Sequence, residues 1–128
     1  MARKSIFPDE SEKPSGFSPG VISGNVLFVS GQVPVTTEGE LVGVGSCLEQ
    51  ARQCFANIER VVNSSGATMD DVTKITAFLV NPEDYSDYAK VRLEQFPDEG
   101  PASSTVFISG LVRSEFLIEV EAFAVLGD

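Results

Sequence analysis

Near the C-terminus, from Phe116 to Val125, acidic and apolar residues alternate in a way that is typical of a β-strand. One face of that strand carries Phe116, Ile118, Val120, Ala122 and Ala124, and the other carries Leu117, Glu119, Glu121, Phe123 and Val125. Two carboxylates thus stand on one face of an otherwise apolar strand, where each needs a hydrogen-bond partner or water. We expect any functional site to include this strand.

A second strand is predicted just before it, over residues 104–111, from its β-branched and aromatic residues. A short polar turn separates the two strands, so the pattern predicts a closing hairpin.

The N-terminal part predicts three more strands. Residues 4–7 form a short edge strand, and a polar loop follows over residues 8–16. Gly24 and Asn25 are typical of a two-residue hairpin turn between the second and third strands. The third strand, residues 26–30, is almost continuously apolar and is predicted to be buried on both faces.

The middle of the chain predicts an amphipathic helix. Ser46 and Glu49 have the spacing of a capping box, and Ser64, Ser65 and Gly66 end the helix. The inward stripe recurs every three or four residues and consists of Leu48, Ala51, Phe55, Ile58 and Val62, widened by Cys47, Cys54 and Val61. Asn57 is placed with the polar residues on the outer face.

A β-branched strand over residues 72–80 precedes a second helix. Asn81 is its predicted N-cap, Pro82 its first helical residue, and Pro97 ends it. The residues predicted to face inward are Tyr85, Tyr88, Ala89, Arg92 and Phe96.

This order of elements predicts an α+β two-layer sandwich: a mixed six-stranded sheet with two helices on one face. There is no repeat or linker, so residues 1–128 are expected to be one domain. The sheet face without helices is too apolar to stay in water, and we therefore expect subunits to associate through it.

Charge and composition restrict the chemistry. The net charge of −10, without a basic stripe, disfavours nucleic acid and anionic membranes as partners. Histidine is absent, which removes histidine-based triads and the commonest zinc sites, and Cys47 and Cys54 are expected to be reduced core residues. No apolar run approaches the ~20 residues of a membrane span, and no signal peptide is visible, so a cytoplasmic protein is expected.

Four segments together resemble the reactive-intermediate deaminase (Rid) family, also called YjgF-like or L-PSP-like. These are Val-Ser-Gly-Gln-Val-Pro at 29–34, Gln-Ala-Arg-Gln at 50–53, the strand at 72–80 and Ile-Glu-Val-Glu-Ala-Phe-Ala-Val at 118–125. The resemblance extends in register from about Phe17 to Val125. It implies a chorismate-mutase-like subunit and a homotrimer with a central barrel of sheets. Small-molecule ligands would bind in clefts between subunits, and enamines and imines would be hydrolysed without a cofactor or metal.

Carried over residue by residue, the resemblance implies that Glu119 positions the hydrolytic water. A carboxylate bonded to backbone or arginine at a subunit interface is the alternative for this residue. The implied substrate-binding positions are Phe17, Ser30, Gly31, Ala89, Arg92, Ser103, Ser104 and Thr105. For Ser30, a hydroxyl that stabilises a turn is the alternative.

The resemblance also predicts a loss of function. Active members carry an arginine after Pro-Ala that grips the substrate carboxylate, whereas this chain has Ser103 after Pro101 and Ala102. Phe17 stands for a tyrosine and Ala89 for an asparagine of the family pattern. Arg92 or Arg113 could supply a substitute guanidinium, although a solvated or ion-paired arginine is the simpler interpretation.

Three functions remain open on this basis. The first is a metabolite-binding protein with little general 2-iminoacid deaminase activity. The second is a deaminase for another enamine, such as an aminomuconate, and the third is a non-catalytic partner-binding protein.

Overall fold

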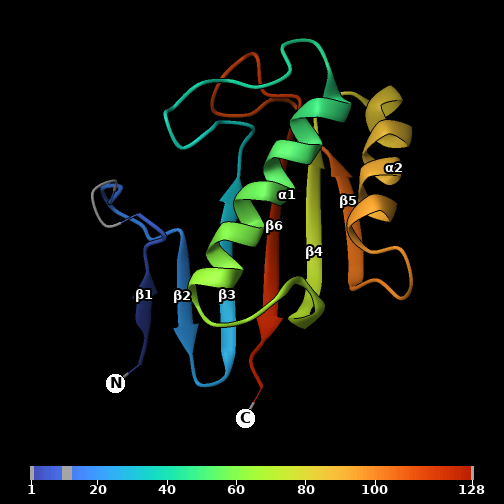
Figure 1. The fold of residues 1–128 in the computed structure, drawn as a ribbon. Coiled ribbons are helices and arrows are strands. Elements are labelled where there is room, and N and C mark those ends of the chain that lie inside the picture. The colour runs from blue at the N-terminus through green and yellow to red at the C-terminus, as the bar shows by residue number, and fades with distance from the viewer. Residues whose placement is uncertain (1, 10–12, 128) are drawn as a thin grey trace.

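The structure, a computed structural model, describes residues 2–9 and 13–127. A mixed six-stranded sheet carries two α-helices on one face, which confirms the predicted two-layer α+β architecture (Figure 1). In chain order the elements are β1 (Lys4–Ile6), β2 (Gly20–Ser23), β3 (Val26–Gln32), α1 (Cys47–Ser64), β4 (Val72–Leu79), α2 (Tyr85–Gln95), β5 (Ala102–Phe107) and β6 (Ile118–Val125). Short 3₁₀ helices, η2 (Met69–Asp71) and η3 (Pro82–Asp84), precede β4 and α2. Residues 10–12 of the predicted loop 8–16 lie outside the described residues.

The predicted closing hairpin is wrong. The strand order is β1-β2-β3-β6-β4-β5, so β4 separates β5 from β6. β5 pairs with β4 in parallel, as the α2 crossover between them requires, and β6 runs antiparallel to both β3 and β4. Hydrophobic alternation identifies a strand, but it does not identify the strand's partner. The segment 108–117 is therefore a connection across the sheet end rather than a turn (Figure 1).

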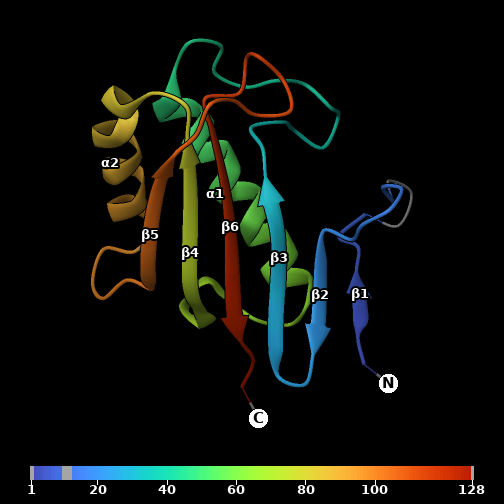
Figure 2. The same ribbon diagram turned by 180° about the vertical axis from the view of Figure 1, so that it is seen from behind.

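The β2–β3 hairpin is confirmed, with Gly24 at φ 62° in the turn. The prediction that residues 26–30 are buried on both faces is wrong for the single chain, because Phe28 is 42% exposed. Its ring packs edge-on against Phe123, with the ring centroids 5.2 Å apart. Both rings lie on the side of β3 and β6 opposite to their buried residues, on the sheet face that carries no helix. Figure 2 views the sheet from this face. This face, called the open face below, also exposes Val106 and Val125.

Helix α1 supplies the core on the other face of the sheet. Its N-cap hydroxyl, Ser46 Oγ, accepts a hydrogen bond from the Glu49 amide at 3.2 Å, and Gly66 adopts φ 87° after the helix. Asn57, predicted on the outer face, is buried instead. Its Nδ2 donates to the carbonyls of Val33 and Val35, both at 2.9 Å, because the loop after β3 folds over the helix. No described helix is long and apolar enough to cross a membrane.

Gln50 of α1 is fully buried and joins three segments. Its Nε2 donates to Gly43 O at 3.1 Å and to Glu115 O at 3.0 Å, and its Oε1 accepts from the Leu117 amide at 2.8 Å. The connection that leads into β6 is thereby fixed to α1 two residues before Glu119.

Helix α2 packs beside α1 and over the edge of the sheet at β5 (Figure 1). Tyr88 and Val91 are buried, whereas Tyr85, predicted to face inward, is 40% exposed. Helical spacing placed Tyr85 on the correct side, but the sheet ends at β5 and leaves nothing to cover the ring.

Candidate functional site

The residues singled out from the sequence form two groups on different faces of the sheet. Glu119 lies on the open face, with Gly31, Ser30 and Phe17 near the end of β3. Ala89, Arg92, Ser103 and Thr105 lie together on the helix-bearing face, in a groove between α2 and β5 that we call the α2–β5 groove. Neighbouring residues of a strand point to opposite faces, so Ser104 lies on the open face, where its hydroxyl accepts from Lys74 Nζ at 2.7 Å.

The Glu119 carboxylate lies directly over the backbone of Gly31. A Cβ atom at position 31 would come within 1.9 Å of Glu119 Oε2. A β-bulge in β3, between Val29 and Gln32, brings the two residues together. Glu119 is half-buried and makes no hydrogen bond or salt bridge within residues 2–9 and 13–127. Burial, with a smaller contribution from the nearby Glu121 carboxylate, raises the pKa of Glu119.

Glu119→Gln is expected to stabilise the protein at neutral pH but not at acid pH. Because the pKa of Glu119 is raised above its ordinary value of 4.5, the folded state retains a proton that the unfolded chain releases. The wild-type protein therefore loses stability as the pH rises from below 4.5 through the raised pKa, and the glutamine variant escapes this loss. Urea unfolding between about pH 4 and about pH 7 measures the effect. A difference between the two proteins that does not change with pH would contradict the assignment.

Ser30 is held by the segment before β2. Its hydroxyl donates to Ser18 O at 2.5 Å and its amide donates to Pro19 O at 2.9 Å. The hydroxyl hydrogen is therefore used within the chain, and Ser30 offers a ligand only oxygen lone pairs. Phe17, 60% exposed, and Ser30 line a hollow of about 520 Å³ on this side of the molecule.

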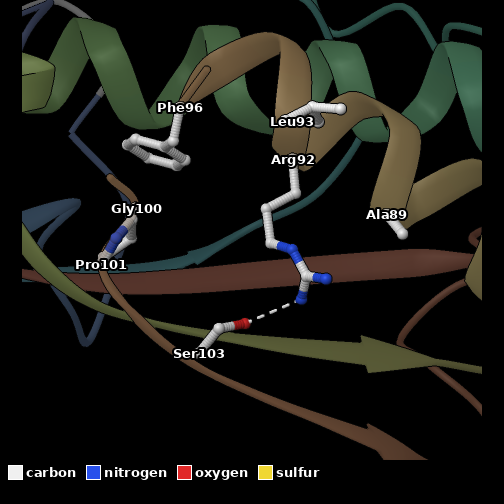
Figure 3. Close-up of a pocket in the computed structure, with 7 residues that line it drawn as sticks. All are labelled: Ala89, Arg92, Leu93, Phe96, Gly100, Pro101 and Ser103. Atoms are coloured by element: carbon white, nitrogen blue, oxygen red, sulfur yellow. Dashed lines mark hydrogen bonds between the residues drawn. The ribbon is translucent and has the colours of Figure 1, made fainter. Parts of the chain in front are cut away.

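The α2–β5 groove consists of two adjoining hollows of about 500 and 590 Å³, and Arg92 and Ser103 line both. The Arg92 side chain reaches from α2 across the groove toward β5 (Figure 3). Its Nη1 donates to Ser103 Oγ at 3.1 Å and its Nη2 donates to Tyr85 Oη at 3.2 Å. The guanidinium carbon lies 5.8 Å from the ring centroid of Tyr85 and 5.2 Å from that of Tyr88, within the range of cation–π attraction.

Tyr88 contributes a buried hydroxyl beside this guanidinium. Among the buried polar side-chain atoms of the described residues, Tyr88 Oη is the one without a hydrogen-bond partner. Burial raises the pKa of Tyr88, and the neighbouring Ser103 and Arg92 act in the opposite direction. The sequence analysis assigned Tyr85 and Tyr88 to the core. Their spacing from Arg92 places all three side chains on one face of the helix, and this was the signal that could have indicated a common site.

Other candidate groups are occupied elsewhere. Arg113 Nε lies 3.5 Å from Glu115 Oε1, and its guanidinium packs over the Phe116 ring at 5.1 Å. Cys47 and Cys54 are free and buried, as predicted, and burial raises the pKa of the Cys47 thiol to about 12. In the part of the chain that the structure describes, no three or more His, Cys, Asp or Glu side chains are arranged to hold a metal ion.

Comparison with known proteins agrees with this fold. The sequence profile of the family described as Endoribonuclease L-PSP matches residues 10–126. A RutC family protein from Pyrococcus abyssi is 36% identical over 126 residues, which cover 97% of this chain and 98% of the relative. A second, from Pyrococcus horikoshii, is 36% identical over 121 residues and is covered over 94% of its length.

Solved structures show the same architecture. YyfA from Yersinia pestis, a member of the Rid family described as having unknown function, superposes with a TM-score of 0.89 at 29% identity, covering 98% of this chain and all of YyfA. Yeast Mmf1 superposes with a TM-score of 0.88 at 26% identity, covering 98% of this chain and all of Mmf1. The sequence profile, the curated relatives and the fold agree, and the chain belongs to the Rid (YjgF, L-PSP) family.

Proposed function

We propose that this protein is a homotrimer that binds a small metabolite in clefts between its subunits. The observation that carries the proposal is the position of Glu119 and Arg92 on opposite faces of one sheet. A small molecule cannot reach both faces of one subunit, whereas a neighbouring subunit could place its Glu119 beside the α2–β5 groove. The exposed apolar side chains of the open face, among them Phe28 and Phe123, support association through that face.

Glu119 would position and activate water in this cleft. A general base at neutral pH benefits from a raised pKa, and the burial of Glu119 raises it. The carboxylate is also free of intrachain partners among the described residues, so its oxygens are available to a water molecule. This chemistry would require no cofactor and no metal.

We further propose that general 2-iminoacid deaminase activity is weak or absent. Ser103 stands where the resemblance implies an arginine, and a hydroxyl cannot replace a bidentate charged contact with a carboxylate. Losing such a contact costs about 2–5 kcal/mol, or roughly one and a half to three and a half decades in rate or affinity.

The test is an assay of ammonia release from 2-aminoacrylate generated in situ and from an aminomuconate. We expect little turnover of 2-aminoacrylate, and appreciable turnover would refute the low-activity proposal. Where any substrate is turned over, Glu119→Ala should abolish it; unchanged turnover would refute the water-activating role. Light scattering provides the independent test of assembly, because a monomer would exclude a cleft between subunits.

A second candidate is a deaminase for a different enamine, such as an aminomuconate, which the unpartnered Glu119 carboxylate favours. The matching profile is described as an endoribonuclease. We do not propose that activity here, because the chain carries nine Lys and Arg residues against 19 Asp and Glu residues and has a net charge of −10.

A further inference from the structure

Arg92 differs from Arg52 and Arg113, whose side chains contact carboxylates. Arg52 makes two hydrogen bonds to Glu94, at 3.0 and 2.7 Å, and Arg113 lies beside Glu115. The contacts of Arg92 within the described residues are with hydroxyls and aromatic rings instead. A partly buried guanidinium without a carboxylate partner is unusual in a chain that carries 19 acidic residues.

The groups around Arg92 have more donors than acceptors. A guanidinium carries five N–H groups, and two of them are used, one by Ser103 and one by Tyr85. Both hydroxyl oxygens accept from Arg92, so each hydroxyl keeps its own hydrogen to donate. The buried hydroxyl of Tyr88 forms no hydrogen bond of good geometry. Its polar neighbours, the Ser103 hydroxyl and the Arg92 guanidinium, which both act against burial to lower its pKa, are donors toward it rather than acceptors. The cluster therefore lacks a negatively charged acceptor.

The surroundings of the cluster match an organic anion. The two hollows that share Arg92 are also lined by apolar side chains, namely Ala89, Leu93 and Phe96 in one and Pro82 and Phe107 in the other. Figure 3 shows the guanidinium extended between the helix and Ser103, with Phe96 farther along the same groove. A ligand with an acidic group and an apolar body would satisfy both parts of the groove.

We propose that Arg92, together with the hydroxyls of Tyr85 and Ser103, binds the carboxylate group of the ligand in the α2–β5 groove. A carboxylate is planar and accepts two parallel N–H bonds from a guanidinium, and three N–H groups of Arg92 remain to supply them. The tyrosine rings fix the guanidinium before the ligand arrives, which reduces the entropy lost on binding.

This inference deepens the proposed function, since it assigns a ligand class to the same cleft. It also predicts a different geometry, because the charged contact comes from helix α2 rather than from the strand position of Ser103. A carboxylate held by Arg92 would lie nearer to α2 than one held by a side chain at position 103, so short 2-imino acids would be displaced from the catalytic water. A longer or bulkier acid would compensate for this displacement.

The test uses benzoate as the anionic probe and benzamide as its neutral counterpart, with binding followed by calorimetry. Wild-type protein is expected to bind benzoate and to discriminate against benzamide. Arg92→Gln should weaken benzoate binding about ten- to a hundredfold, because a hydrogen bond to a charged group is lost. Tyr85→Phe, which alters a half-exposed residue and should not disturb folding, should weaken it about two- to tenfold.

Arg113→Gln is the matched control, since it removes another guanidinium outside the groove and should leave benzoate affinity unchanged. The inference is overturned if wild-type protein does not bind benzoate, if Arg92→Gln binds it as well as wild type, or if inorganic phosphate binds through Arg92 and benzoate does not. These outcomes are separable from failure of the proposed function. Arg92-dependent binding would support the anion site even if Glu119→Ala left turnover intact or light scattering found a monomer.

Discussion

Gln50→Leu is expected to lower the free energy of unfolding by about 2–5 kcal/mol, although leucine has a similar volume and suits a buried position. The amide of Gln50 satisfies two carbonyls and one backbone N–H from segments that lie far apart in the sequence. Leucine would leave the Glu115 carbonyl and the Leu117 amide without partners, whereas the Gly43 carbonyl would still accept from the Ser46 amide at 2.8 Å. Each buried orphan costs about 1–3 kcal/mol. The Leu117 amide should account for most of the loss, since it lies at the start of the central strand β6.

Equilibrium urea unfolding measures this effect, with both proteins at the same protomer concentration because any assembly contributes to apparent stability. Gln53→Leu is the matched control on the same helix. The Gln53 side chain donates to a single side-chain oxygen, Asn57 Oδ1, at 2.9 Å, so the loss should be below about 1 kcal/mol. Equal losses in the two variants would show that the buried hydrogen bonds of Gln50 do not determine stability.

The elements of the fold could be predicted from local patterns, whereas their pairing could not. The alternation of β6 correctly separated its buried and open faces, and Ser46 and Gly66 marked the ends of α1. Asn81, the predicted N-cap of the second helix, precedes the short 3₁₀ helix η3 instead, and the N-cap of α2 is Asp84. The hairpin prediction failed because β5 and β6 adjoin in sequence, while the long connection between them lets β6 pair with β3 and β4. Which strands pair depends on nonlocal contacts, which leave no periodic signal in a strand's own residues.

The burial of two polar residues could not be predicted for a related reason. Asn57 and Gln50 are polar and were not assigned to the core, yet both are buried because their side-chain amides donate to backbone carbonyls of distant loops, among them those of Val35 and Glu115. A sequence pattern records hydrophobicity, but it does not record where a distant loop will present an unpaired carbonyl.

The candidate site was predictable residue by residue but not as an arrangement. The family resemblance indicated Glu119, Ser30 and position 103, and helical spacing placed Arg92 on the same face as Tyr85 and Tyr88. The structure adds that Glu119 rests on Gly31 and that Arg92 contacts Ser103. Both contacts join residues from separate elements, so neither follows from spacing along the chain.

Gly31→Ala is expected to remove any Glu119-dependent turnover, by about a hundredfold or more, while leaving the fold intact. The backbone of Gly31 does not have a positive φ, so alanine is tolerated there. The new Cβ would meet Oε2, Cδ and Cγ of Glu119 at 1.9, 2.8 and 3.1 Å. Every one of these contacts is with one flexible side chain, so Glu119 will turn away before the sheet distorts.

Two measurements identify this displacement. The pKa of Glu119, followed by NMR of its side-chain carboxyl group, is raised by burial in the wild-type protein and should fall toward its ordinary value in Gly31→Ala. The urea midpoint should stay the same or rise slightly, since replacing glycine at a compatible position restricts the unfolded chain. Gly110→Ala is the matched control, because a Cβ at Gly110 meets nothing within 4 Å. An unchanged Glu119 pKa in Gly31→Ala would mean that the carboxylate is held by contacts other than the close approach of the Gly31 backbone, and its role in positioning water would then need another geometric basis.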